Sequence, residues 1–220
     1  MKVLINFANE KYRKTQKFNS WTGKHIAKFD NIIEFSPEDI DSDFFNKNSK
    51  ILSTKRGAGL WLWKPYFVNK VLNELKDGDY LFYSDSGAFF IRGISALIQS
   101  MGQDEIWLYG LPLKECQFTQ REVFETMNAV DNCFKETNQF SATFLLLKVG
   151  DKSRAFVKEW LNLCCKYELI AARDTDQIDS FIAHREDQSI LSILAKKYNI
   201  KMHLDPSQYG KLPEKSLSTT

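Results

Sequence analysis

Short apolar runs alternate with helical segments from one end of this chain to the other. Runs of strand length occupy residues 2–7, 31–35, 80–83, 106–109, 144–149 and 200–204. Strands that alternate with helices are typical of an α/β fold, in which ligands bind at the carboxyl ends of the strands. We therefore predict an α/β fold with a mainly parallel central sheet flanked by helices.

The length of the chain and its charge limit what such a fold can be used for. The 220 residues allow one sizeable core, and we predict one domain over 1–210 and a polar, mobile tail over 211–220. The formal net charge is only +2, which argues against a nucleic-acid partner. No apolar stretch reaches the ~18 residues of a membrane span, so we expect a cytoplasmic protein.

One aspartate follows the most apolar of the predicted strands. Tyr83, Ser84, Asp85, Ser86 and Gly87 close the run that begins at residue 80. A carboxylate at a strand end can hold Mg²⁺ or Mn²⁺ against phosphate oxygens, and the glycine allows a ligand to approach the backbone. An Asx-turn explains the same aspartate equally well.

A second candidate segment runs from residue 56 to residue 66. Arg56 and Lys64 flank two glycines and two tryptophans, next to a helix that Pro65 is expected to open. Two cations beside a helix N-terminus suit a diphosphate. The spacing matches neither a dinucleotide fingerprint nor a P-loop, and the aromatic side chains are also explained by packing under the sheet.

The third candidate lies at the start of the last long helix. His184, Arg185, Glu186, Asp187 and Gln188 follow one another there. A helix cap accounts for one carboxylate but leaves the histidine, the arginine and the glutamine unexplained. A separate histidine, at position 203, ends the last predicted strand, where it either completes a metal shell or is satisfied locally.

Taken together, these segments resemble bacterial glycosyltransferases of capsule and lipopolysaccharide biosynthesis. The likeness rests on RGAGLWLWKPY at 56–66, DGDYLFYSDSG at 77–87 and HREDQSILSIL at 184–194, with FANEKYRKTQKF near the start and NQFSATFLLLK at 138–148. Such enzymes belong to the GT-A class, whose Rossmann-like domain binds a nucleotide-sugar and commonly a divalent cation, Mn²⁺ or Mg²⁺, through an Asp-x-Asp motif.

The resemblance assigns roles to individual residues. Asp85 matches the first aspartate of that motif, while Gly87 stands where the second is expected. Asp187 and Gln188 resemble the pair that opens a helix over the donor sugar. His203 is similar in position to the last metal ligand of glycogenin-like enzymes, although the Lys-Pro-Trp found there is missing.

The resulting site prediction has three parts. Catalytic residues are expected to be Asp187, Gln188 and His184, and the metal ligands Asp85 and His203. The donor nucleotide-sugar is expected to contact Arg56, Lys64, Tyr83, Asp85, Ser86, Gly87, Gln139 and Ser141.

The predicted function is transfer of a sugar from a nucleotide-diphosphate donor to a glycan or lipid-linked acceptor. Lipid-linked acceptors imply peripheral contact with the inner membrane, and Lys11, Arg13, Lys14 and Lys17 offer a basic stretch for it, although a solvated helix face is the simpler explanation. A metal-dependent nucleotidyltransferase or phosphohydrolase would use the same residues. A binding module without catalysis is the third reading, and the missing second aspartate favours it.

Overall fold

The computed structural model describes residues 1–173 and 175–207. Within them, seven strands form one sheet with the order β2, β1, β3, β6, β4, β5, and β7 pairs with β4. The strands are β1 (Lys2–Phe7), β2 (Asn31–Phe35), β3 (Tyr80–Ser84), β4 (Ile106–Lys114), β5 (Asn138–Phe140), β6 (Phe144–Lys148) and β7 (Met202–His203). The domain boundary expected at residue 210 and the tail expected over 211–220 lie outside the described residues.

The sheet is mixed. β1 pairs in parallel with β2 and β3, and β7 in parallel with β4, whereas β6 runs antiparallel to both β3 and β4, and β5 antiparallel to β4. A strand buried on both faces has the same continuous apolar sequence in either direction, so the apolar run of β6 could not reveal its reversal. That reversal places the start of β6 beside the carboxyl end of β3.

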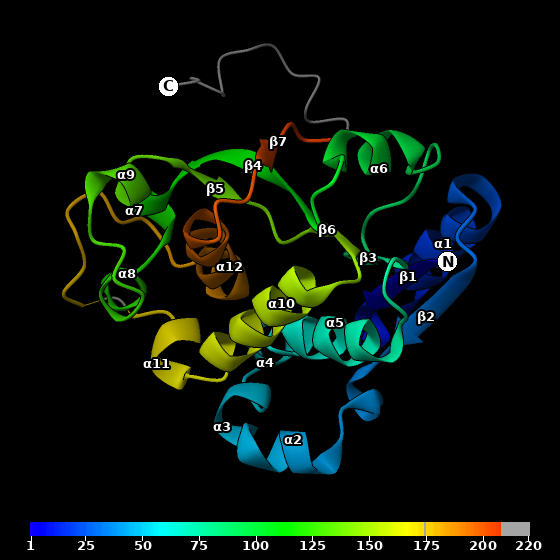
Figure 1. Ribbon diagram of the computed structural model, residues 1–220. Coiled ribbons are helices and arrows are strands. Elements are labelled where there is room, and N and C mark those ends of the chain that lie inside the picture. The colour runs from blue at the N-terminus through cyan, green and yellow to red at the C-terminus, as the bar shows by residue number, and fades with distance from the viewer. Residues whose placement is uncertain (174, 208–220) are drawn as a thin grey trace.

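Helices cover both faces of this sheet, as Figure 1 shows. The longer helices are α1 (Arg13–Thr22), α5 (Trp63–Glu74), α6 (Ser95–Met101), α10 (Asp151–Cys164) and α12 (Glu186–Lys197), and a π-helical turn, Gly23–Ala27, continues α1. The shorter ones are α2 (Ser42–Lys47), α3 (Ser49–Leu52), α4 (Gly57–Leu60), α7 (Glu115–Phe118), α8 (Arg121–Thr126), α9 (Asn132–Lys135) and α11 (Tyr167–Ile170), with 3₁₀ turns at Glu10–Tyr12 and Pro37–Asp39.

Alternation along the strands divides the core in two. Val3, Ile5 and Leu81 pack with the helices α5, α10 and α12, while Leu4 and Phe82 belong to a second cluster that includes residues of α6. Successive strand residues point to opposite faces, so a sheet covered on both sides needs apolar residues at every position. The α/β prediction, with one domain and helices on both faces, is confirmed.

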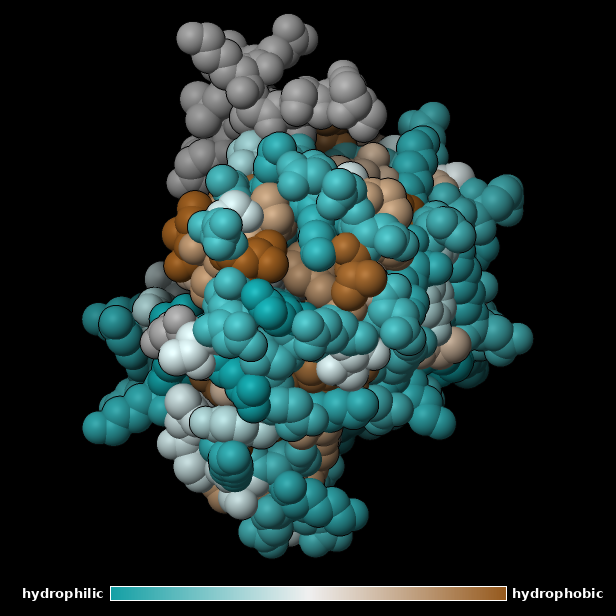
Figure 2. Space-filling view, turned by 90° about the vertical axis from the view of Figure 1, so that its left-hand side faces the viewer, coloured by the Kyte–Doolittle hydropathy of each residue, from teal (hydrophilic) through white to brown (hydrophobic). Residues whose placement is uncertain are grey.

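The surface over α7 to α9 carries hydrophobic side chains in separate groups within a largely hydrophilic face (Figure 2). Val130 and Ile182 are among the exposed apolar residues of the chain. In the described residues, no helix combines the length and the apolar character that crossing a bilayer requires.

Candidate functional site

A buried lysine between two aspartates forms the centre of the candidate site. Lys64 is only 3% exposed, and its Nζ lies 3.4 Å from Asp85 Oδ1 and 3.3 Å from Asp187 Oδ2. The same ammonium donates a hydrogen bond of 3.0 Å to the carbonyl oxygen of Ala142. We call Lys64, Asp85 and Asp187 the acidic cluster, because it holds two carboxylates for one cation.

Three elements bring the acidic cluster together at the carboxyl end of β3. Asp85 directly follows β3, and its backbone N–H donates to Thr143 O at 3.0 Å, just before the reversed strand β6 begins. Lys64 lies in the first turn of α5, and Asp187 in the first turn of α12. The strand-end location predicted for Asp85 is the one observed, and the antiparallel return of β6 supplies the backbone around it.

The two carboxylates have different surroundings. The Asp85 side chain is 38% exposed, and its Oδ1 accepts a 2.5 Å hydrogen bond from the hydroxyl of Tyr83. Asp187 is 4% exposed, and among the described residues its Oδ2 accepts no hydrogen bond, although the ammonium of Lys64 is within ion-pair distance. A buried oxygen left in this state raises the free energy of the folded protein unless something pairs with it.

Burial and charge set the protonation states of the acidic cluster. Burial raises the pKa of Asp187 to about 7, against the attraction of Lys64. Burial alone would lower the pKa of Lys64, but Asp187 and Asp85 together raise it above its ordinary value. Near neutral pH the lysine therefore stays charged while Asp187 can gain or lose a proton, the property that a general acid or base needs.

The segment before α5 is held in an unusual backbone conformation. Five consecutive residues, from Gly57 to Trp61, have positive φ angles between 50° and 100°. Gly59 lies so close to Leu52 that an added Cβ would come within 2.9 Å of the Leu52 Cα. Left-handed backbone costs roughly 1–2 kcal/mol for each residue other than glycine. The glycines are therefore required by the turn itself, and strain of this kind is often found at functional sites.

Arg56 stands immediately before the strained turn. Its Nε donates to Glu186 Oε1 at 2.5 Å, although 59% of the arginine side chain is exposed. Burial raises the pKa of Glu186, and the guanidinium of Arg56 opposes that shift. This ion pair ties the turn to the first turn of α12, and it leaves a charged, accessible guanidinium on the same segment as Lys64.

Two glutamines, the half-buried Gln188 and the buried Gln139, continue the acidic cluster into the core. Gln188 Nε2 donates to Gln139 Oε1 at 3.0 Å, while the N–H of Ala142 donates to Gln188 Oε1 at 3.3 Å. Gln139 is fully buried and donates in turn to Glu115 Oε2 at 3.1 Å. Gln139, expected to contact the donor, holds Gln188 in one orientation.

Ser141, also expected to contact the donor, is fully buried. Its hydroxyl donates to the hydroxyl of Tyr109 at 2.8 Å, and the N–H of Thr143 donates to the serine oxygen at 3.2 Å. Sequence reasoning missed both the carbonyl of Ala142 and the hydroxyl of Tyr109. A backbone group carries no residue signature, and Tyr109 lies within β4, at the end of an apolar run that gives no hint of a polar role.

His184 does not join the acidic cluster. Its Nε2 is 2.8 Å from Leu169 O, and the backbone N–H of Gln120 donates to its Nδ1 at 3.5 Å. Burial lowers the pKa of this histidine to about 4, so the ring is neutral at neutral pH. These contacts join His184 to α11 and to the residue before α8, so of the three predicted catalytic residues only Asp187 and Gln188 lie at the candidate site.

The donor set expected for a metal ion is not assembled. In the part of the chain that the structure describes, no three or more His, Cys, Asp or Glu residues are placed to hold a metal ion together. Asp85 faces the ammonium of Lys64, and the ring of His203 stacks on Trp107 at 5.1 Å. Among the described residues His203 Nε2 is buried without a hydrogen-bond partner, and a divalent cation held by Asp85 and His203 stays a prediction.

The two residues after Asp85 differ in exposure. Ser86 is buried, whereas Gly87 is exposed and a Cβ added to it would meet no atom within 4 Å. An aspartate at position 87 is therefore compatible with this backbone, so the departure from the Asp-x-Asp pattern is a matter of sequence and not of space.

Comparisons with known proteins bear on the fold. No protein-family model and no curated protein sequence matches the chain. Among solved structures, the apo form of mouse xyloside xylosyltransferase 1 superposes with a TM-score of 0.52 at 10% identity, over 92% of this chain and 84% of that one. The galactosyltransferase LgtC, in complex with donor and acceptor sugar analogues, gives a TM-score of 0.45 at 14% identity, over 94% and 81%. Glycosyltransferase GlyE of Streptococcus pneumoniae gives 0.46 at 14%, over 89% and 43%. The likeness to the xylosyltransferase concerns the fold alone, and it confirms the predicted GT-A-type α/β architecture.

Proposed function

We propose that this protein transfers a sugar from a nucleoside-diphosphate donor to a hydroxyl group of a glycan or lipid-linked acceptor, in the synthesis of a surface polysaccharide. The observation that carries the proposal is the acidic cluster: two carboxylates share one buried ammonium at the carboxyl end of β3. In open α/β sheets this end is where ligands bind. The fold shared with a glycosyltransferase supports the same assignment.

Each residue of the site suits one part of that reaction. In the transfer, the bond between the anomeric carbon and the diphosphate oxygen breaks, a bond to the acceptor oxygen forms, and the hydroxyl proton must be accepted. Asp85 is exposed enough to accept hydrogen bonds from hydroxyl groups of the donor. Arg56, with its accessible guanidinium, suits the departing diphosphate, since fixed positive charge lowers the barrier where negative charge develops.

Asp187 is the residue best suited to the proton. Its pKa of about 7 allows it to accept a proton near neutral pH. Lys64 holds both carboxylates in place, and Gln188 is fixed beside them by Gln139. The divalent cation and the ligand role of His203 remain predictions from the resemblance, and no step of the reaction is assigned to them.

The test is product analysis combined with two substitutions. Purified protein is incubated with UDP-, GDP- and dTDP-linked hexoses and a panel of glycan acceptors, and the release of nucleoside diphosphate and the transferred sugar are both measured. Asp187→Asn removes the proton acceptor but preserves shape, so we expect a rate loss on the order of 10²–10⁴. Asp85→Asn should weaken binding of the donor.

The matched control is Asp43→Asn, which alters an exposed aspartate in α2 and should leave the rate unchanged. Release of inorganic phosphate or pyrophosphate without sugar transfer would support the nucleotidyltransferase or phosphohydrolase reading. Donor binding without turnover on any acceptor would support the binding module. Transfer at the parent rate by both Asp187→Asn and Asp85→Asn would refute the assignment of the site.

A further inference from the structure

Helix α1 presents its polar side to the protein and its aromatic side to the solvent. Gln16, Asn19 and Thr22 are each at most 1% exposed, whereas Phe18 and Trp21 are both 52% exposed. A helix on the surface of a globular protein ordinarily turns its apolar stripe towards the core. The reversed arrangement of α1 leaves about half of each of these aromatic side chains exposed to solvent.

Hydrogen bonds fix this orientation. Gln16 Nε2 donates to Asn6 Oδ1 at 3.1 Å and to Phe35 O at 2.8 Å. Asn19 Oδ1 accepts from Asn6 Nδ2 at 2.8 Å. Buried amides with these partners would lose them if the helix rotated, and the loss would cost about 1–3 kcal/mol for each unsatisfied group. The outward direction of Phe18 and Trp21 is thus built into the fold.

A third aromatic side chain from another part of the chain joins them. Phe89, in the loop after β3, is 57% exposed, and its ring centroid lies 5.5 Å from that of Phe18, which stacks at 6.4 Å on Trp21. We call Phe18, Trp21 and Phe89 the aromatic patch. Grouped exposed aromatic side chains, unlike single ones, usually mark an interaction surface.

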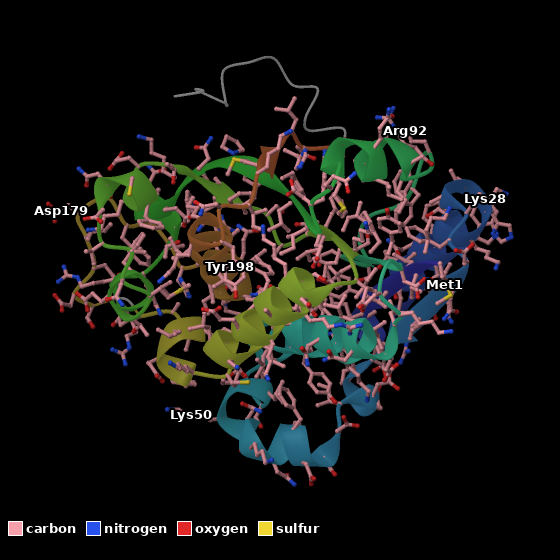
Figure 3. All side chains as sticks on the ribbon, in the orientation of Figure 1. Met1, Lys28, Lys50, Arg92, Asp179 and Tyr198 are labelled. Atoms are coloured by element: carbon pink, nitrogen blue, oxygen red, sulfur yellow. The ribbon has the colours of Figure 1, made fainter. Side chains whose placement is uncertain are left out.

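The surroundings of the aromatic patch are strongly basic. Residues 11–28 contain six Lys or Arg and no Asp or Glu: Lys11, Arg13, Lys14, Lys17, Lys24 and Lys28. Lys17 pairs with Glu34, and Arg13 lies 4.0 Å from Glu38, but Lys14, Lys24 and Lys28 are exposed and form no ion pair with any described residue. Figure 3 shows Arg92, from the loop that carries Phe89, above Lys28 at the same edge of the molecule.

We propose that this surface, the aromatic patch with the cations around it, binds an anionic lipid bilayer. An anionic bilayer has negative headgroups directly above an apolar layer. The headgroups suit the lysine and arginine side chains, and the apolar layer suits the aromatic rings that they surround. Tryptophan is enriched at that depth in membrane proteins. Two acids, Asp30 and Glu34, line a surface hollow of about 640 Å³ together with Trp21 and Lys24, and Glu34 is already neutralised by Lys17.

Hydrogen bonds connect helix α1, which carries the aromatic patch, to the candidate site. Asn19 Nδ2 donates to Ser84 Oγ at 3.0 Å and to Ala88 O at 2.9 Å, on either side of Asp85. The N–H of Phe90 donates to Thr22 Oγ1 at 3.1 Å. The loop that follows Asp85 is therefore fastened to α1, and a bilayer held at the aromatic patch would lie close to that loop. Use of this contact to reach a lipid-linked acceptor rests on the proposed function, whereas the binding itself does not.

The experiment is co-sedimentation of the full chain with vesicles. One set consists of phosphatidylcholine alone and the other contains 30% phosphatidylglycerol. We expect at least tenfold stronger partitioning to the anionic set, weakened by 0.5 M NaCl because salt screens exposed charges. The triple variant Phe18→Ser, Trp21→Ser, Phe89→Ser should lose at least tenfold. The triple variant Lys14→Glu, Lys24→Glu, Lys28→Glu should lose a similar amount and provides a second route if the first variant does not fold.

The matched control replaces Val130, Ile182 and Leu204 with serine, since these residues are also apolar and exposed but lie outside the aromatic patch. It should bind within twofold of the parent. Equal partitioning to both vesicle sets, or equal losses for the patch and control variants, would overturn the proposal. Displacement from vesicles by single-stranded RNA at equal charge would also overturn it, since the surface would then bind polyanions in general. Asp187→Asn should bind vesicles like the parent, whatever the outcome for sugar transfer.

Discussion

This protein contains two places where a lysine ammonium meets buried carboxylate oxygens, and the two differ in how many hydrogen bonds those oxygens accept. Glu115, fully buried, accepts hydrogen bonds from Thr119, Gln139, Ser192 and Lys196. In the acidic cluster, Lys64 serves two carboxylates, and Asp187 Oδ2 accepts no hydrogen bond from any described residue. The first group is saturated by its own protein, whereas the second has unused capacity to bind something else.

The difference in pairing indicates that Glu115 serves stability, whereas the acidic cluster serves function. When protein donors occupy all the acceptor sites of a buried carboxylate, they compensate the cost of burying its charge. Such a carboxylate has no acceptor site left for a ligand. An incompletely paired carboxylate with a raised pKa, at the carboxyl end of a strand, is what a reactive site requires. The number of donors to each oxygen therefore distinguishes Glu115 from Asp187 better than burial does, since both of these side chains are deeply buried.

The largest expected effect is a loss of folding stability when Glu115 is substituted. Glu115→Gln leaves the largely buried ammonium of Lys196 without its counter-charge, and breaking a buried pair in this way costs about 3–5 kcal/mol of the free energy of unfolding. Urea denaturation measures the loss. Glu136→Gln is the control, because it breaks the exposed pair with Lys114 and should change stability little or not at all. Equal losses from the two substitutions would show that the network around Glu115 is not a structural one.

A smaller effect is expected on the pH dependence of folding stability, through Asp187. The pKa of Asp187 is raised to about 7 in the folded protein, above its ordinary value of 3.8, so the folded state keeps a proton that the unfolded state has lost. Stability should therefore fall as pH rises from about 4 through 7. Asn cannot ionise, so Asp187→Asn should gain stability over the parent between pH 5 and pH 8, on the order of 2 kcal/mol.

Urea denaturation of both proteins at the two pH values tests this, with Asp43→Asn as the control that should track the parent. A parent whose stability relative to Asp187→Asn is the same at pH 5 and pH 8 would mean that Asp187 is ionised throughout. Its surroundings would then be those of a saturated carboxylate such as Glu115.

Sequence patterns predicted the strand-end aspartate and the helix-start pair because these positions follow from local rules. A continuous apolar run followed by Ser84 and Asp85 marks the end of a buried strand, and residues 186–188 mark a helix start. The tertiary details had no such signal. The antiparallel direction of β6, the carbonyl of Ala142 on Lys64 and the structural position of His184 depend on contacts between residues distant in sequence.

The aromatic and basic character of α1 was visible in the sequence, but its direction was not. Lys11 and Lys14 marked a basic stretch, yet the buried amides that turn Phe18 outward could be recognised only in the fold. A helix with polar residues on one side predicts solvent on that side by default. This default fails when the sheet beneath the helix offers hydrogen-bonding partners such as Asn6.

The smallest expected effect tests whether Lys64 or a divalent cation neutralises the carboxylates of the acidic cluster. Lys64 already supplies a positive charge 3.4 Å from Asp85 Oδ1, and the described residues assemble no set of three metal-binding side chains. We therefore expect excess EDTA to change the rate of sugar transfer less than twofold. Loss of activity in EDTA, restored by Mn²⁺, would instead show that Asp85 exchanges the ammonium for a divalent cation when the donor binds. In that event Gly87→Asp, which the backbone has room for, should strengthen the dependence on Mn²⁺, because it adds a second carboxylate beside the first.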